Sequence, residues 1–376
     1  MNSNEIDAFE NQIDHLIALL QDLVQIESPS TDKQALDSFG SFVAEHMRSL
    51  GAKVEHFTQE KQGDHWIGRW GTGSGGILLL VHLDTVYPVG TLSTMPWRQD
   101  DSHVYGPGSL DMKASLAMAL TVIDHLQGAG KLRSDRISLL CTSDEEIGSI
   151  SSRALIESQA REHALVLCLE PALPDGSLKT WRKGILNFQL KATGQAAHAG
   201  SEIKAGTNAI VEIAHHIPAL LSLSDDSVGT TLNMGVIQGG SRSNVVPEQC
   251  QLQIDVRVKT KDEGERILHA IHGMAPVLEG AKLTTTGSWN RPPMERDQLM
   301  QTTFQRAANI ASGLGIKLTE GGTGGGSDAN FVAGLGIPVL DGLGAIGSGA
   351  HSERERVEIR SLAERCGLLA ALISEW

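Results

Sequence analysis

Histidine and carboxylate residues follow several short apolar runs of this chain, each just beyond the end of a run. The runs span residues 77–81, 137–141, 165–169 and 337–340, and the side chains that follow them are His82, Glu145, Glu146, Glu170 and His351. Apolar runs without polar alternation are typical of strands buried on both faces of a sheet. Because open α/β sheets bind ligands at the carboxyl ends of their parallel strands, we expect these side chains to form one site.

Two imidazoles and several carboxylates make a nitrogen and oxygen ligand set that suits zinc, and less specifically cobalt or manganese. A further carboxylate, Asp111, lies in the turn-rich segment 105–113, at the start of a helical pattern. One carboxylate shared between two ions gives a two-metal site with the ions about 3.5–4 Å apart. Two divalent ions carry +4, and Asp111, Glu146, Glu170 and one bound hydroxide carry −4, so such a site can be nearly neutral.

Each of these motifs also has a purely structural interpretation. His82 could be a buried histidine at a strand end, Asp111 could be the N-cap of the following helix, and residues 143–146 fit a capping box. The other two motifs could belong to ordinary loops. Their shared position beyond the strand ends favours the functional interpretation, because independent structural residues would not all fall at one edge of a sheet.

The pattern of the chain predicts the elements that hold these residues. The buried runs alternate with helical patterns, notably at residues 112–126 and 362–373, and an amphipathic helix is expected over residues 6–23. Strands that alternate with helices imply an α/β domain with a largely parallel central sheet. We expect this catalytic domain to comprise residues 1–182 and 290–376.

A second domain is expected to be inserted at residues 183–289, where the strands become half-exposed. In residues 249–258 the even positions are apolar and the odd positions polar, which is typical of a strand with one face in solvent. The elements follow the β-α-β-β-α-β order of a ferredoxin-like module. They are strands 184–193, 229–238, 249–258 and 281–287 and helices 206–222 and 262–278.

Composition excludes several classes of protein. The chain carries 31 Lys and Arg against 45 Asp and Glu, a net charge of −14, which argues against nucleic acid as a partner. No apolar run reaches the roughly 18 residues of a membrane span, and acidic groups replace the basic segment of a signal peptide near the N-terminus. The four cysteines form no C-x-x-C pair, so we expect free thiols in a cytoplasmic protein. The glycine-rich run 321–326 lacks the G-K-[ST] of a phosphate loop.

Several short segments carry a family resemblance. They lie at residues 81–86, 106–113, 143–148, 169–171, 197–200, 243–247, 255–257, 323–329 and 350–352. Together they resemble the co-catalytic zinc hydrolases, a family that includes acetylornithine deacetylase, succinyl-diaminopimelate desuccinylase, aminoacylase and glutamate carboxypeptidase. The context of residues 183–185, Asn244, Arg257 and 291–293 is most similar to glutamate carboxypeptidase.

The resemblance implies two zinc ions per subunit, with cobalt or manganese as possible substitutes, and a set of five ligands. The ligands would be His82, Asp111 and Glu170 for one ion and Asp111, Glu146 and His351 for the other. It also implies that Asp84 orients His82 and that Glu145 is the general base. Physical chemistry agrees for Glu145, because it adjoins a ligand yet stays free to take a proton from a water activated by zinc.

The inserted domain resembles the lid and dimerisation domain of the family, which predicts a homodimer. His198 would reach the active site of the partner subunit and stabilise the oxyanion of the tetrahedral intermediate. A guanidinium suits a carboxylate because the two groups can form a bidentate contact. The residues implied for the free carboxylate of the substrate are Asn244, Arg257, Arg291 and the backbone of Gly325 and Gly326.

The sequence therefore predicts a hydrolase that cleaves an amide bond next to a free carboxylate. The substrate would be a small N-acyl amino acid or a short peptide, from which a carboxypeptidase releases the C-terminal amino acid. The alternative is an N-acyl-amino-acid deacylase of the acetylornithine deacetylase type. A silent binding protein on the same fold is a third possibility, and it is disfavoured because no ligand and no base is missing.

Overall fold

The computed structural model describes residues 3–132 and 136–376 of the chain. The chain divides into two compact units. The first contains the N-terminal part up to Trp181 together with Arg296–Thr323 and Ser327–Trp376, and the second contains Arg182–Glu295 and Gly324–Gly326. The second unit therefore extends six residues beyond the predicted boundary at residue 289 and includes part of the glycine-rich run.

The first unit is built on a sheet that has eight strands in the described part of the chain. In spatial order they are β1 (Lys53–Phe57), β2 (His65–Trp70), β6 (Ile137–Thr142), β3 (Ile77–His82), β7 (Leu165–Cys168), β14 (Val339–Asp341), β8 (Leu178–Arg182) and β13 (Glu320–Thr323). The middle strands β6, β3, β7 and β14 are parallel, whereas β1, β2 and β8 pair antiparallel with their neighbours. The α/β class with a largely parallel central sheet is thus confirmed.

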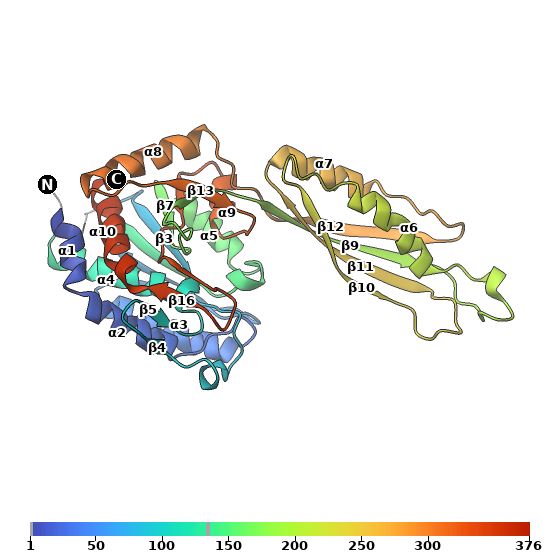
Figure 1. Ribbon diagram of the computed structural model, residues 1–376, viewed down its shortest axis with the longest axis horizontal. Helices are drawn as coiled ribbons and strands as arrows, with labels where there is room; N and C mark the ends of the chain where they lie inside the picture. Colours follow the sequence, from blue (N-terminus) through green and yellow to red (C-terminus); the bar gives the residue numbers. More distant parts are fainter. Residues whose placement is uncertain (1–2, 133–135) are drawn as a thin grey trace. The chain divides into compact units, whose positions relative to one another are not determined.

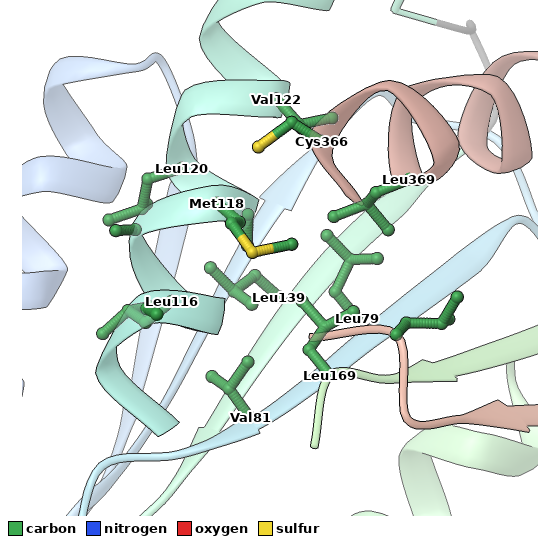
Figure 2. Packing of buried hydrophobic residues seen from close by; sticks show 14 of the residues in the cluster. Leu79, Val81, Leu116, Met118, Leu120, Val122, Leu139, Leu169, Cys366 and Leu369 are labelled. Atoms are coloured by element: carbon green, nitrogen blue, oxygen red, sulfur yellow. The ribbon is translucent and has the colours of Figure 1, made fainter. Parts of the chain in front are cut away.

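The parallel strands are buried because helices cover them. All residues of β3, β6 and β7 are buried, as their unbroken apolar runs predict. Two of the covering helices are α4 (Ala114–Gly128) and α10 (Ile359–Glu375), which lie near the same part of the sheet (Figure 1). Figure 2 shows Leu79 and Leu139 of the sheet packed with Met118 and Leu369 of these helices. Each such side chain contributes roughly 1.5–3 kcal/mol when it is fully buried.

The N-terminal segment differs from its prediction, because one helix is replaced by two. They are α1 (Ser3–Glu10) and α2 (Ile13–Val24), and the backbone leaves helical geometry at Gln12, with φ −107° and ψ 6°. The break lets Phe9 and Leu16 both lie in the core. The other helices of the first unit are α3 (Lys33–Ser49), α5 (Arg153–Arg161), α8 (Gln298–Gly313) and α9 (Ala329–Gly334).

A small antiparallel sheet completes the first unit. Its strands, in spatial order, are β15 (Gly347–Ser348), β16 (Arg356–Glu358), β5 (His103–Tyr105) and β4 (Arg98–Gln99). The short strand β16 pairs with both β15 and β5. This sheet brings the segment around residue 350 next to the segment around residue 105, although the two are far apart in sequence.

The second unit is an antiparallel sheet with two helices. The strands, in spatial order, are β10 (Thr231–Gly239), β11 (Gln249–Val258), β9 (Gly184–Thr193) and β12 (Lys282–Arg291). The helices α6 (Ala209–Leu221) and α7 (Lys261–His272) lie along this sheet (Figure 1). The even positions of β11 are buried in the core that these helices share with the sheet. Helix α7 ends six residues earlier than predicted, since Gly273 and Pro276 both disfavour its continuation.

A helix that spans a membrane must be both long and apolar. No helix within residues 3–132 and 136–376 is long and apolar enough to cross a membrane.

Candidate metal centre

His82 is held in one orientation at the end of β3. Its buried Nδ1 donates a hydrogen bond to the backbone oxygen of Asp84 at 2.9 Å. The other ring nitrogen, Nε2, faces Asp111 Oδ1 at 3.1 Å and Glu170 Oε1 at 3.8 Å. Because Nδ1 carries the proton, Nε2 is the nitrogen that can bind a metal ion.

The Asp84 carboxylate connects the end of β3 to the segment that follows β6. It is fully buried and accepts hydrogen bonds from the backbone N–H of Glu145 at 3.2 Å and of Glu146 at 3.1 Å, and from the Ser30 hydroxyl at 2.8 Å. Burial opposes its ionisation, but His82, Ser30 and the Glu146 N–H outweigh burial and lower the pKa of Asp84. Asp84 therefore positions the two glutamates, while its own backbone oxygen orients His82.

Glu145 and Glu146 lie on a short 3₁₀ helix, Glu145–Ile147, directly beyond β6. The capping-box interpretation of residues 143–146 is wrong, because the Ser143 hydroxyl donates to the backbone oxygen of Asp64 at 2.6 Å and no side chain caps this helix. The Glu145 carboxylate instead lies near His82 and Glu170, with one potential ligand atom from each within 4.8 Å of the others.

Asp111 lies between the two histidines of the site. Its Oδ1 faces His82 as described, and its Oδ2 faces Nε2 of His351 at 3.3 Å. The N-cap interpretation of Asp111 is wrong, since Lys113 occupies the N-cap position of α4 and its side chain caps nothing. Burial opposes ionisation, yet hydrogen bonds with His351 and His82 lower the pKa of Asp111. A carboxylate with one oxygen on each side is suited to bridge two cations.

His351 completes the outer side of the site. Its Nε2 lies 3.1 Å from Glu146 Oε1, and about half of its side chain, 51%, is exposed. Its φ of 61° is in the left-handed region, where a residue other than glycine is strained and is held by its surroundings. Gly349, two residues before His351 and at φ 82°, has no room for a side chain, because a Cβ would lie 2.5 Å from the backbone oxygen of Arg354.

The spacing of these donor atoms fits divalent metal ions. Ligands bound at about 2.0–2.2 Å around a tetrahedral zinc lie roughly 3.3–3.6 Å from one another. The contacts from His82 and His351 to the three carboxylates range from 3.1 to 3.8 Å. A second group, His82, Asp111 and Glu146, also brings its ligand atoms within 4.8 Å of one another. The residues present therefore form a candidate metal site.

The second unit contains His198, on an exposed turn. The N–H groups of Gly200 and Ser201 both donate to His198 Nδ1 at 3.1 Å, so the proton of the neutral ring lies on Nε2. The Ala199 N–H donates to the backbone oxygen of Asn244 at 3.1 Å, which places Asn244 beside this turn. The turn thus presents an imidazole N–H with a fixed orientation.

The predicted carboxylate-binding residues of the second unit have different surroundings. Arg257 forms a two-pronged ion pair with Asp255, at 2.7 and 3.0 Å. Arg291 is buried at the end of β12, where Nη1 donates to Asn290 Oδ1 at 3.1 Å. The two predicted arginines therefore differ in surroundings, because Arg257 is only partly buried and is paired with Asp255, whereas Arg291 is buried.

The glycine run packs against Arg291 inside the second unit. A Cβ on Gly326 would lie 2.6 Å from Ile185 Cδ1 and 3.0 Å from Arg291 Cδ, so a larger residue there would require these side chains to shift. Gly325 is exposed. Buried Arg182, which the sequence analysis missed, donates from Nη1 to the Gly326 oxygen at 2.9 Å. Nothing in its local sequence identifies this role, because the contact spans 144 residues.

Paired imidazoles and carboxylates at the carboxyl edge of an α/β sheet suit a metal-dependent hydrolase. The sequence profile of peptidase family M20/M25/M40 matches residues 78–375, and the chain belongs to this family. The predicted resemblance and the predicted metallohydrolase class are both confirmed.

Two relatives and one solved structure illustrate the likeness. Carboxypeptidase G2 of Pseudomonas sp. (strain RS-16) is 31% identical over 374 residues, which cover 96% of this chain and 89% of that protein. Succinyl-diaminopimelate desuccinylase of Leptothrix cholodnii is 25% identical over 383 residues, covering 92% and 94% of the two chains. YXEP of Bacillus subtilis, a dinuclear metal binding peptidase, has the same fold, with a TM-score of 0.68, 16% identity, and coverage of 97% and 99%.

We expect metal uptake by the metal-free protein to release about two protons at pH 7. Hydrogen bonds with Asp111 and Glu146 raise the pKa of His351 to about 10. Burial opposes protonation of His82, but Asp111 and Asp84 outweigh burial and raise its pKa well above the ordinary value. Both rings are therefore protonated below these raised pKa values and must lose the proton to bind metal, so affinity rises with pH. Calorimetric Zn²⁺ titrations in buffers of different ionisation enthalpy measure the release, and a buffer-independent heat would contradict it.

Proposed function

We propose that this protein is a zinc-dependent hydrolase that cleaves an amide bond next to a free carboxylate and releases a C-terminal amino acid from an N-acyl or peptidyl substrate. The observation that carries the proposal is Asp111 between two histidines, with the Glu145 carboxylate beside the same site. Similarity to carboxypeptidase G2 over 96% of the chain supports the carboxypeptidase reaction.

Two zinc ions are the metals that we propose for the site, held by the five ligands predicted from the sequence. Zn²⁺ suits imidazole nitrogen and carboxylate oxygen, and Co²⁺ or Mn²⁺ can use the same donors. When bound, the ions supply Lewis acidity, which lowers the pKa of a water and polarises the scissile carbonyl. The near-neutral balance between two divalent ions and the surrounding carboxylates supports a pair rather than a single ion.

Glu145 is proposed as the general base and acid of the reaction. Its backbone is fixed by the hydrogen bond to Asp84, which holds the carboxylate next to His82 and Glu170. In this position Glu145 takes a proton from the attacking water and delivers it to the leaving nitrogen, so that the amine departs uncharged. The Nε2–H of His198 is proposed to donate to the oxyanion, because its turn fixes the donor before substrate binds.

We propose that Arg291 is the main group that recognises the substrate carboxylate. A buried guanidinium forms stronger charge-assisted hydrogen bonds than an exposed one. Asn244 and the backbone of Gly325 and Gly326 are proposed to add further hydrogen bonds. Arg257 is proposed for a secondary contact, because its pairing with Asp255 means that a substrate would share the guanidinium with that carboxylate.

A deacylase of the N-acyl-amino-acid type is the second candidate function. It is supported by the 25% identity with succinyl-diaminopimelate desuccinylase over 92% of this chain. The two reactions break the same kind of bond and differ in which side of it the protein recognises.

The proposed reaction is tested with zinc-loaded protein on a panel of N-acyl amino acids and dipeptides, with products identified by mass spectrometry. We expect Glu145→Gln to keep both metals and to lose about 10²–10⁴-fold in kcat, the usual contribution of a positioned acid and base. We expect Glu146→Gln to lose metal, because its carboxylate faces His351 directly.

The adjacent glutamates serve as controls for each other, since both backbone N–H groups bind Asp84. Metal content by atomic emission separates the roles. Equal loss of metal in the two variants would show that the base has been assigned to the wrong residue. Wild-type protein with two zinc ions and no turnover of any panel member would contradict the proposed reaction itself.

Replacing Arg291 tests carboxylate recognition. We expect Arg291→Ala to lower kcat/KM by about 10²-fold or more, on the scale of a charge-assisted contact of roughly 1.5–3 kcal/mol together with lost orientation. The loss should shrink greatly for a substrate in which an amide replaces the carboxylate, because wild-type protein already lacks the contact there. Steady-state kinetics on the matched acid and amide substrates measure the loss in kcat/KM for each. Equal losses on both substrates would mean that Arg291 has only a structural role.

A homodimer formed through the second unit is also proposed. Strand β10 is an edge strand of that unit, and edge strands offer unpaired backbone groups for pairing with another chain. Its Val236 and Ile237 are 39% and 53% exposed, and Val211 on the neighbouring helix α6 is 41% exposed. This exposed apolar surface beside an unpaired edge supports a second copy of the chain as the partner.

We expect wild-type protein to scatter light as a dimer of the 40.2 kDa chain, and Ile237→Lys to shift it toward monomer. Lysine on an edge strand opposes pairing because its charge would be buried in the interface. Val277→Lys is the matched control, since Val277 is 55% exposed in the same unit but lies outside β10 and α6. A monomeric wild type, or equal effects of the two substitutions, would rule out this interface.

A further inference from the structure

Glu355 is a fully buried carboxylate four residues after His351. Its Oε1 accepts hydrogen bonds from the backbone N–H of Leu110 at 2.8 Å and of Asp111 at 2.9 Å. Its Oε2 accepts from the N–H of Gly108 at 3.1 Å and from the Tyr87 hydroxyl at 2.6 Å. Four donors therefore converge on one carboxylate, which lies outside the predicted set of ligands.

These contacts join three segments that carry residues of the candidate metal centre. Tyr87 follows β3 and the His82 and Asp84 motif, and its hydroxyl also contacts the Ser352 oxygen at 3.0 Å. The N–H donors belong to the segment that carries Asp111, and Glu355 itself belongs to the segment that carries His351. The contacts span 244–268 residues of sequence, so local structure alone would not hold the three segments together.

The chemistry of the contacts requires an acceptor at both oxygens. A backbone N–H can only donate, so each carboxylate oxygen faces at least one obligate donor. An ionised glutamate meets this requirement, because both of its oxygens accept. Glutamine has the same shape, but its NH₂ group is a donor and would face the N–H or O–H donors without an acceptor between them. An unsatisfied buried donor is costly, and hydrogen bonds to a charged acceptor are the stronger ones. The carboxylate at this position is therefore not replaceable by a neutral side chain of similar size.

We propose that Glu355, together with Tyr87, is a positioning residue that sets the Asp111 carboxylate between His82 and His351. Glu355 touches no ligand side chain and acts through the backbone N–H of Asp111. Its removal would free the segment 108–111 relative to His351, so the bridging carboxylate would no longer reach both imidazoles at once. This inference rests on the two-metal site of the proposed function and adds the residues that hold its shared ligand in place.

The experiment uses the full chain, stripped of metal by chelation and titrated with Co²⁺, whose absorption spectrum reports the ligands of each ion. The variants are Glu355→Gln and Tyr87→Phe. Tyr105→Phe is the matched control, because Tyr105 is the other tyrosine of the chain and its hydroxyl also donates to a carboxylate, Asp100 Oδ2 at 2.8 Å. Thermal unfolding of each variant is followed in parallel.

We expect Glu355→Gln to weaken binding of one Co²⁺ by about 10–100-fold, as removal of partners behind a ligand usually does, and to change its absorption spectrum. Tyr87→Phe should weaken the same ion by about three- to tenfold, because the three N–H donors remain. Tyr105→Phe should bind both ions like the wild type. If Glu355→Gln does not fold, the comparison of Tyr87→Phe with Tyr105→Phe decides by itself.

A role in folding alone would lower the unfolding temperature and leave Co²⁺ affinity and spectrum unchanged in the folded protein. That result, in folded Glu355→Gln or in folded Tyr87→Phe, overturns the proposal. Failure of the proposed reaction is distinguished from failure of the Glu355 proposal, because the Co²⁺ titration needs no substrate. Wild-type protein that binds two Co²⁺ ions but cleaves no panel member would reject the reaction and leave the role of Glu355 intact.

Discussion

Repulsion among carboxylates at the carboxyl edge of the central sheet is the constraint on which this structure depends. Asp111, Glu146 and Glu170 point into one small region, and carboxylates so close repel one another strongly where water is scarce. The buried charge of Asp84 is balanced differently, by backbone N–H groups and a hydroxyl. Hydrogen bonds thus stabilise the buried charge of Asp84. The negative charge of the other three carboxylates is left for divalent ions to neutralise.

The two sides of the site are built in different ways, and the difference follows from where they lie in the sheet. The His82 side stands on strand ends in the middle of the sheet, and the side chain of His82 is only 2% exposed. The His351 side stands on loops and includes strained backbone, and the side chain of His351 is 51% exposed. Strand ends are rigid because their neighbours are buried on both faces, whereas loops need added contacts. The hydrogen bonds around Glu355 supply such contacts on the loop side.

The second unit divides its roles between the two faces of its sheet and its loops. One face packs against α6 and α7, so the apolar residues of β11 are buried and its polar residues face outward. The turn of His198 is exposed and lies outside this core, whereas Gly326 packs against Ile185 and Arg291. Residues on such loops can be selected for recognition, because the core of the unit does not depend on their side chains.

The sequence by itself determined the buried parallel strands, because an unbroken apolar run reports burial on both faces without knowledge of the neighbours. It also pointed to His82, Glu145, Glu146 and Glu170, which closely follow such runs. Asp111 lies in a turn-rich segment and His351 further beyond its run, so their place beside the other ligands was set by the tertiary structure. Only the tertiary structure decided the break at Gln12, the partners of Asp84, the contact of Arg182 with Gly326 and the contacts of Glu355. Asp84 meets Ser30 across 54 residues and Glu355 meets Asp111 across 244. Hydrogen bonds of this kind leave no periodic trace in a sequence, because they depend on how loops that are distant in the chain are brought together by the packing of the core.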